Sequence, residues 1–366
     1  MDPMTKKDTI IIHCSDRFAC SWYRQRFVAM LLMTDRVGDV KTVLTRFEVT
    51  DEHVLARTAA ILFGRTFSEQ SGGSMVRHYV ARRRKYGYRI FVDYDDLLFS
   101  LDGRQAIPEY NPKPIDTVEA GRYLAKMLPH LDGVTVSTEF LKHAITGVFG
   151  YDRVTVLPNA VPRYCFGHAR KRAAMHGVPR VLYAGSMGHF KDGSVGDFDG
   201  PWVPWLTEDV KAGKIELHVF DNVKFMDQVA DKVHVHAGVS AAEFPATIAA
   251  IEPDIYLAPL QPNNFNRAKS NLKLLEATAI GAVLLCSDFE GGPYDEAHPL
   301  SKVEPWVTLD ALRVIVDLLK FNYGKVMEYQ RWLMDEKGYW MDSDRYLERF
   351  LRVYFKENLV VNGRTA

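Results

Sequence analysis

The sequence predicts an α/β protein with two domains, each built on a parallel β-sheet. The chain has 366 residues, and one hydrophobic core seldom extends much beyond about 250 to 300 residues. Short apolar runs alternate with segments of helical length, which is typical of parallel, doubly wound sheets. The composition, 47% hydrophobic and 25% charged, is that of an ordinary globular protein.

The expected strands form two successive sets. In the first half they are residues 9–14, 59–64, 88–94, 133–138 and 153–159. The second half repeats the pattern with PRVLYAG, KIELHVF, KVHVHAG, PDIYLAPL and AVLLCS. Two such sets predict two Rossmann-like domains, whose ligands bind outside the carboxyl ends of the strands.

A change of composition places the boundary between the domains. The segment 158–179 is rich in Pro, Arg and small residues and is typical of a linker. We therefore expect an N-terminal domain, a linker, a C-terminal domain and a final segment, at residues 1–160, 161–178, 179–335 and 336–366. The final segment has apolar residues at 346, 347, 350, 351, 354 and 355, which form one face of a helix that Ser343 would cap.

Charge and hydropathy exclude several classes of protein. The formal net charge is zero, so any attraction to nucleic acid or anionic lipid must be local. The longest apolar runs fall far short of the roughly 18 residues that span a bilayer, and the first one is too short for a signal-peptide core. Four cysteines without a CxxC pair fit a reduced, cytoplasmic protein.

The stretch KSNLKLLEATAIGAVLLCSDFEG predicts a loop, a helix and a buried strand that together bind a diphosphate. Ser270 is a suitable N-cap, and the N–H groups of Asn271 and Leu272 add to the positive end of the helix. Lys269 supplies a cation, while Glu276, six residues after Ser270, can bond a ribose hydroxyl. The alternative is a solvated lysine and glutamate on an ordinary helix.

This stretch resembles the donor-binding segment of the family 4 retaining glycosyltransferases, which have the GT-B fold. Their pattern has two glutamates followed by A-x-A-x-G. Glu276, Ala277, Ala279 and Gly281 match its second half, and Ala268 stands where the first glutamate would be. The resemblance implies that Glu276 holds the nucleotide ribose. It also implies two Rossmann-like domains facing across a cleft, with a C-terminal helix that crosses back to the first.

A second window, VLYAGSMGHFKDG, is a strand followed by a turn in which Gly185 lets the backbone approach a ligand closely. Family 4 enzymes have an arginine here, followed five residues later by a lysine, and both bind the diphosphate. This chain has Ser186 and Lys191 at these positions. Arg267 can replace the missing guanidinium, since arginine and lysine both neutralise phosphate. The alternative is a plain connection.

Asp93, Asp95 and Asp96 follow a predicted strand in the sequence IFVDYDDLLFS. Asp93 and Asp95 match the DxD of GT-A glycosyltransferases, whose carboxylates bind a divalent metal. We prefer the D-D-L-F pattern, which resembles a GT-B subgroup of bacterial and phage-encoded enzymes in which the acidic pair faces the cleft from the acceptor domain. Capping and salt bridging by loop carboxylates is the structural alternative.

The loop after the first strand resembles the same subgroup through Cys20, Tyr23 and Arg24, and the resemblance implies that it lines the site near the phosphates or the acceptor. Cys20 has no identifiable partner base, so we do not expect it to be a nucleophile. A basic run over 77–89 contains, among others, Arg82, Arg83, Arg84 and Lys85. It predicts contact with DNA phosphates or lipid head groups, or a solvated helix face.

The function implied is transfer of a hexose or pentose from a nucleotide diphosphate sugar, here a UDP-sugar, to a hydroxyl acceptor. Retention without a metal or other cofactor is expected. Lys191 and Lys269 would stabilise the leaving diphosphate, and Asp95 and Asp96 would act from the acceptor side. The acceptor is either a hydroxymethylated base in phage DNA, modified in the host cytoplasm, or a surface glycan. A sugar-nucleotide epimerase and a non-catalytic binder remain alternatives.

Overall fold

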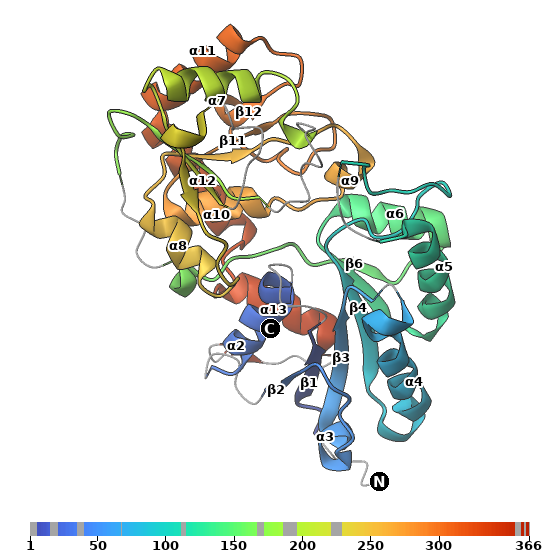
Figure 1. Cartoon of the computed structure of the whole chain (residues 1–366). Helices are drawn as coiled ribbons and strands as arrows, with labels where there is room; N and C mark the ends of the chain where they lie inside the picture. Colours follow the sequence, from blue (N-terminus) through green and yellow to red (C-terminus); the bar gives the residue numbers. More distant parts are fainter. Residues whose placement is uncertain are drawn as a thin grey trace. The chain divides into compact units, whose positions relative to one another are not determined.

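The computed structural model describes residues 6–14, 21–34, 40–66, 68–110, 115–166, 172–185, 196–220, 229–355, 360–361 and 364–365. The chain divides into two compact units (Figure 1). Unit 1 comprises Met1–Ala106, Ile115–Ala160 and Trp340–Ala366, and unit 2 comprises Ile107–Pro114 and Val161–Tyr339.

Unit 1 is built on a six-stranded parallel sheet in the order β2-β1-β3-β4-β5-β6. Its strands are β1 (Thr9–His13), β2 (Lys41–Thr45), β3 (Thr58–Gly64), β4 (Arg89–Tyr94), β5 (Gly133–Val136) and β6 (Val154–Val156). The sequence predicted all of them except β2, which lies at an edge of the sheet and is only partly buried.

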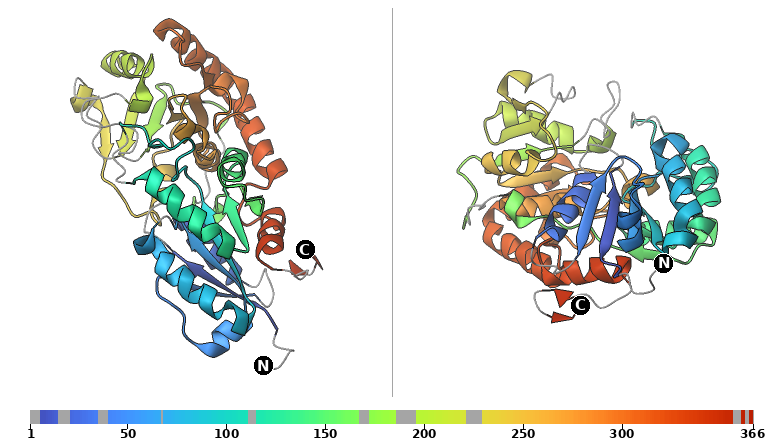
Figure 2. Two further views of the ribbon diagram at one scale, coloured as in Figure 1. Left: turned by 90° about the vertical axis from the view of Figure 1, so that its right-hand side faces the viewer. Right: turned by 90° about the horizontal axis from the view of Figure 1, so that it is seen from below.

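Helices cover both faces of this sheet. They are η1 (Trp22–Arg26), α2 (Phe27–Leu32), α3 (Glu52–Arg57), η3 (Glu69–Gly73), α4 (Ser74–Tyr86), α5 (Thr117–Met127), η4 (Leu128–His130), α6 (Glu139–Phe149) and α13 (Asp344–Tyr354). Figures 1 and 2 show α4 and α5 on one face and α13 on the other.

Helix α13 confirms the expected C-terminal helix and packs on unit 1. The Ser343 side chain caps it by accepting a hydrogen bond from the Tyr346 N–H at 3.2 Å. Its apolar face is buried, as predicted. The Tyr354 hydroxyl lies 2.9 Å from Thr135 Oγ1, and its ring meets that of Phe91 edge-on at 5.1 Å between centroids.

Unit 2 contains a second six-stranded parallel sheet, in the order β12-β11-β10-β7-β8-β9. Its strands are β7 (Arg180–Tyr183), β8 (Glu216–Phe220), β9 (His234–His236), β10 (Ile255–Ala258), β11 (Val283–Ser287) and β12 (Lys302–Val303). The two-residue strand β12 was not predicted. When the strands are numbered from β7, their order in the sheet is 6-5-4-1-2-3, as in dinucleotide-binding sheets. The topological switch point lies between β7 and β10.

The helices of unit 2 enclose a core that includes the fully buried Trp205. They are η5 (Arg163–Cys165), η7 (Gly196–Phe198), α7 (Trp202–Lys211), α8 (Phe244–Ala250), α9 (Asn264–Arg267), α10 (Leu272–Ile280), η9 (Pro299–Ser301), α11 (Leu309–Phe321) and α12 (Tyr323–Lys337). Within the described ranges, no helix of either unit is long and apolar enough to cross a membrane.

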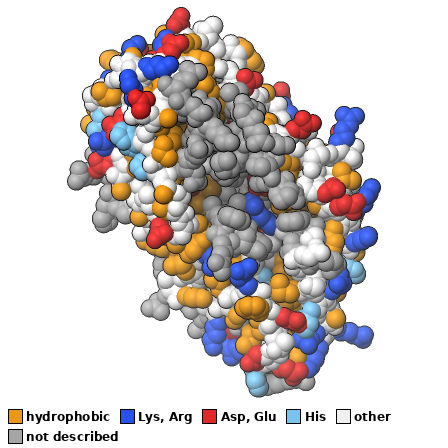
Figure 3. Space-filling view, viewed as in Figure 1, with side chains coloured by type: hydrophobic (Ala, Val, Ile, Leu, Met, Phe, Trp, Pro, Cys, Tyr) orange, Lys and Arg blue, Asp and Glu red, His pale blue; other side chains and the backbone are white. Residues whose placement is uncertain are grey.

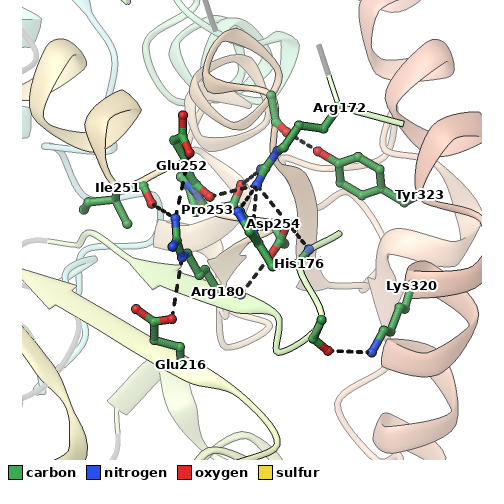
Figure 4. A network of polar contacts seen from close by, with 12 residues as sticks. Arg172, His176, Arg180, Glu216, Ile251, Glu252, Pro253, Asp254, Lys320 and Tyr323 are labelled. Carbon is green, nitrogen blue, oxygen red and sulfur yellow. Dashed lines mark hydrogen bonds and ion pairs between the residues drawn. The ribbon is translucent and has the colours of Figure 1, made fainter. Parts of the chain in front are cut away.

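The buried Asp254 ties the segment before β7 to the amino end of β10 (Figure 4). Its carboxylate accepts hydrogen bonds from the Arg180 N–H at 2.8 Å and from the His176 ring at 2.9 Å. The Arg172 guanidinium forms an ion pair with it at 3.1 Å. This network is at the opposite end of β10 from the edge where ligands of such sheets bind.

Candidate functional site

Lys273, on α10, lies at the switch point of unit 2. Its Nζ donates to the carbonyl of Ala184, which follows β7, and to the Tyr256 hydroxyl of β10 at 2.9 Å. Strands β7 and β10 are neighbours in the sheet although β8 and β9 separate them in the chain. Ligands of open α/β sheets bind outside such a point.

Glu276 lies one turn further along α10 and contacts both Tyr256 and Lys273. Its side chain is buried, with the residue 3% exposed. Its Oε2 accepts a hydrogen bond from the Tyr256 hydroxyl at 3.0 Å and lies 3.6 Å from Lys273 Nζ. Burial lowers the pKa of Lys273, an effect that the charge of Glu276 opposes. A carboxylate has about four acceptor positions and is the kind of group that binds ribose hydroxyls in such sheets.

The start of α10 differs from the prediction in its capping residue. The helix begins at Leu272 with Asn271 as N-cap, whose side chain makes no capping hydrogen bond, so the assignment of Ser270 as N-cap was wrong. The short helix α9 ends at Arg267, which leaves Ser270 in the turn between two helices. The N–H groups of Leu272 and Lys273 have no acceptor within α10 and form its positive end.

Of the three cations predicted to bind phosphate, Arg267 and Lys269 directly precede this start and are both half-buried. Lys269 Nζ lies over the Phe265 ring, 4.8 Å from its centroid. Arg267 donates from Nε to the Glu290 carbonyl and from one terminal nitrogen to Asn264 Oδ1, each at 3.1 Å. A guanidinium has five N–H donors. Arg267 is thus held in place and retains donors for an anion.

Gly185 lies two residues after β7 and packs closely against a side chain of that strand. A Cβ added there would lie 2.1 Å from the Tyr183 hydroxyl, so the close approach is to a tyrosine of the same strand. Ser186 and Lys191 lie outside the described residues.

A buried carboxylate, Asp197, organises the loop after β10. Its Oδ1 accepts from the Tyr110 hydroxyl at 2.8 Å, from Asn266 Nδ2 at 2.7 Å and from the Gln261 N–H at 2.9 Å. Asn263 Nδ2 in turn donates to the Tyr110 hydroxyl at 3.0 Å. Tyr110 belongs to unit 2 although it lies between two segments of unit 1 in the chain. These contacts fix α9 and therefore the loop that carries Arg267 and Lys269.

In unit 1, Asp93 forms a buried ion pair at the carboxyl end of β4. The Arg24 guanidinium donates from Nε to Asp93 Oδ2 at 2.9 Å and from a terminal nitrogen to Oδ1. Thr135 Oγ1 donates to Oδ1 at 2.6 Å. Arg24 also donates to the Leu157 carbonyl and to Asn159 Oδ1. Every one of these contacts is internal, which is the arrangement of a structural ion pair.

Asp95 and Asp96 bind a different arginine. Arg65 donates from Nε to Asp95 Oδ1 at 2.6 Å and from a terminal nitrogen to Asp96 Oδ2 at 2.8 Å. Arg65 directly follows β3 and has a positive φ of 40°, a strained conformation that in proteins clusters at functional sites. Sequence reasoning missed Arg65. Its signal was a cation just after a predicted strand.

The other residues predicted on this side are partly described. Tyr23 is buried and packs edge-on against the Phe27 ring at 5.5 Å, and Cys20 lies outside the described residues. His13, at the carboxyl end of β1, stacks on Phe63 at 4.6 Å, and burial lowers its pKa to about 4.

The basic run lies at the other end of the sheet. Helix α4 ends at Tyr86 and β4 begins at Arg89, so Arg82, Arg83 and Arg84 are at the amino end of β4, whereas Asp93 is near its carboxyl end. Arg83 pairs with Asp132 at 2.9 Å, Lys85 with Glu52 at 2.5 Å, and Arg82 lies 3.9 Å from Glu48. The structure therefore does not bring this run together with the aspartates.

A pocket of about 680 Å³ lies beside it, between the amino ends of β4, β5 and β6 and helix α13. Five arginines and two acidic residues line it: Arg89, Arg153, Arg345, Arg349, Arg352, Asp132 and Glu348. The excess of three positive charges contrasts with the intermixed charges of the face seen in Figure 3.

Comparison with known proteins identifies the fold. No protein-family model and no curated protein sequence matches the chain. Among solved structures, a glycosyltransferase from Rickettsia africae ESF-5 has a TM-score of 0.60 at 13% identity over 96% of this chain and 98% of that one. HepE from Anabaena, in complex with UDP-glucose, has a TM-score of 0.57 at 9% identity over 94% and 99%. TarM has a TM-score of 0.56 at 13% identity over 82% of this chain, which spans 55% of TarM.

The chain thus has the GT-B fold of glycosyltransferases, which confirms the predicted fold class. At these identities the likeness is one of fold alone.

Proposed function

We propose that this protein transfers a sugar from a nucleotide diphosphate sugar to a hydroxyl acceptor. The observation that carries the proposal is the ion pair of Lys273 with the buried Glu276 at the β7–β10 switch point, next to the N-terminus of α10. Such a carboxylate suits a ribose, and such a helix start with two neighbouring cations suits a diphosphate. UDP-glucose in HepE makes a UDP-sugar the first donor to test.

The proposed transfer retains the anomeric configuration. The bond between the anomeric carbon and the diphosphate oxygen breaks, and the acceptor oxygen bonds to that carbon on the same face. The acceptor proton passes to the departing diphosphate. Lys269, Arg267, Lys191 and the N-terminus of α10 stabilise its charge. Lys273 is a positioning residue that orients Glu276.

The transferase, epimerase and binder hypotheses give different products. UDP-sugars are incubated with the protein and candidate acceptors, and the products are separated by chromatography. A transferase releases UDP, an epimerase yields an isomeric UDP-sugar, and a binder yields neither. The pairing of Asp95 and Asp96 with Arg65 disfavours the epimerase, which needs carboxylates poised as acid and base. The anomeric proton coupling of the glycoside tests retention.

We expect turnover to survive metal chelation. Lys269, Arg267 and the helix start can neutralise the diphosphate, while Asp93 accepts hydrogen bonds from Arg24 and Thr135 within unit 1. Initial rates are measured with and without EDTA, with a manganese-dependent GT-A enzyme as the control. Complete loss of turnover that manganese restores contradicts the proposal and returns Asp93 and Asp95 to a metal-binding role.

We propose that the acceptor is anionic, either DNA with hydroxymethylated bases or an anionic surface glycan. The support is the positive charge of the arginine-lined pocket of unit 1 and of the neighbouring basic run. Both lie at the amino ends of the strands, so they would hold a part of the acceptor remote from the reacting hydroxyl. A base in duplex DNA would have to be flipped out to expose its hydroxyl.

One triple variant and one quadruple variant test this acceptor proposal. Neutralising Arg345, Arg349 and Arg352 is expected to weaken acceptor binding and to reduce the slope of log K against log salt by up to about 0.9 per lost phosphate contact. Neutralising Arg82, Arg83, Arg84 and Lys85 should have a smaller effect, because Arg83 and Lys85 are already paired. Both variants should retain UDP affinity. Slopes equal to that of the parent, on hydroxymethylated duplex and on anionic glycan, rule out both basic regions.

A further inference from the structure

Strands β8 and β9 carry four potential metal ligands at alternate positions, in the sequences E-L-H and H-V-H. Alternate residues of a strand point to the same face. The two strands are parallel neighbours, with His218 in register with His234 and Phe220 with His236. The sheet therefore gathers Glu216, His218, His234 and His236 on one face. Neither the predicted donor site nor the acceptor site uses this group.

The side-chain geometry brings three ligand atoms to one point. Glu216 Oε1 lies 3.0 Å from His218 Nε2 and 3.5 Å from His234 Nε2. One ligand atom from each of the three residues falls within 4.8 Å of the other two. Ligands of a tetrahedral zinc ion, at about 2.0 to 2.2 Å from the metal, are roughly 3.4 Å apart. The two carboxylate–imidazole distances are already close to this spacing. The two imidazole nitrogens, at most 4.8 Å apart, would have to approach by no more than about 1.4 Å.

Two neighbouring residues hold the ligands in orientation. His218 Nδ1 lies 3.0 Å from His236 Nε2, so the proton of a metal-bound His218 would be donated to His236, as metal-ligating histidines usually require. The other carboxylate oxygen of Glu216 lies 3.5 Å from Arg180 Nε, a contact visible in Figure 4. This arrangement leaves Oε1 directed toward the histidines.

We propose that Glu216, His218 and His234 bind a divalent transition-metal ion, with Zn²⁺ the best match. His236 orients His218 by accepting a hydrogen bond from its Nδ1–H. Two imidazoles and a carboxylate are suitable ligands for Zn²⁺ and Co²⁺, whereas Mg²⁺ prefers oxygen ligands alone. His234 is 54% exposed at its side chain, so the fourth position is open to water. The ion would fasten the edge strand β9 to β8.

Metal binding to the untagged, chelator-treated full chain tests the proposal without any sugar donor. We expect one Zn²⁺ per chain by calorimetry, and for Co²⁺ the intense visible absorption of a four-coordinate N/O site. His234→Asn should weaken Zn²⁺ binding by at least tenfold, and His236→Asn by about 10- to 100-fold. Because His234 is mainly exposed, its substitution should leave the fold intact. Mg²⁺ should not compete at similar concentrations.

The matched control is His53→Asn, which removes an exposed histidine of α3 in unit 1 and should bind Zn²⁺ like the parent. Three results would overturn the proposal. They are no Zn²⁺ uptake, equal Zn²⁺ affinity in the parent and His234→Asn, and a sulfur-to-cobalt charge-transfer band, which would assign the metal to cysteine. In the first case the group is only an ion-pair network around Glu216.

Discussion

Replacing Asp93 with asparagine is expected to lower the free energy of unfolding of unit 1 by about 3 to 5 kcal/mol, because it leaves the buried Arg24 charge without a counter-ion. Both side chains of this pair are 4% exposed. Chemical denaturation followed by tryptophan fluorescence and by circular dichroism measures the loss. Circular dichroism is included because only two of the six tryptophans, Trp22 and Trp340, belong to unit 1.

The control is Asp102→Asn, an exposed carboxylate of the same unit that lies 3.9 Å from Arg104. It should change stability by no more than about 0.5 kcal/mol. The double variant Arg24→Met, Asp93→Leu should lose less than the sum of the two single variants, since it removes both charges together. If the Asp93→Asn protein is instead as stable as the parent but has lost a manganese-dependent activity that the parent shows, Asp93 is a metal ligand.

The contrast between Asp93 and its neighbours shows why the D-Y-D-D sequence was ambiguous. In strand β4, Asp93 points into the protein toward Arg24 and Thr135, whereas Asp95 and Asp96 follow the strand and bind Arg65. The sequence places three carboxylates at the end of a strand. It does not say which arginine each of them will meet, since every partner is 30 or more positions away.

The strands were predictable where both of their faces are buried. Strands β3 and β11 are continuous apolar runs, and the sequence predicted them nearly to the residue. Strand β2, with the sequence KTVLT, is half-exposed at an edge and has no such run. Strand β12 is only two residues long and exists because it pairs with β11. Edge strands depend on their neighbours for pairing, so local sequence predicts them poorly.

The proposed donor site combines residues that the sequence indicates with one that it did not. Glu276 was predicted from its spacing in the helix, whereas Lys273 was not, because the prediction placed the cation at Lys269 in the loop. A lysine three residues before a glutamate lies on the same helix face, so the signal was present. The depth of Lys273, between Ala184 and Tyr256, depends on the pairing of β7 with β10, which the sequence does not state.

Replacing Glu276 with glutamine is expected to weaken UDP binding by about 1 to 3 kcal/mol, or roughly 5- to 150-fold, because the charge-assisted hydrogen bonds to ribose hydroxyls become neutral or are lost. Glutamine is chosen rather than alanine since it fills the same volume beside Lys273 and Tyr256. Calorimetry with UDP alone measures the change. Glu336→Gln, at an exposed position of α12, is the control and should bind UDP like the parent.

A comparison of UDP with its 2′-deoxy and 3′-deoxy analogues separates a ribose contact from a general loss of packing around Lys273. If Glu276 accepts hydrogen bonds from the ribose, the parent should bind UDP more tightly than at least one of the analogues, since a missing hydroxyl leaves a buried acceptor unsatisfied. Glu276→Gln should lose most of that preference. Lys273→Met, which removes the cation that orients the carboxylate, should reduce it in part. A folded Glu276→Gln protein that discriminates UDP from both analogues as strongly as the parent would mean that another residue holds the ribose, and that the Lys273–Glu276 pair only joins α10 to the sheet.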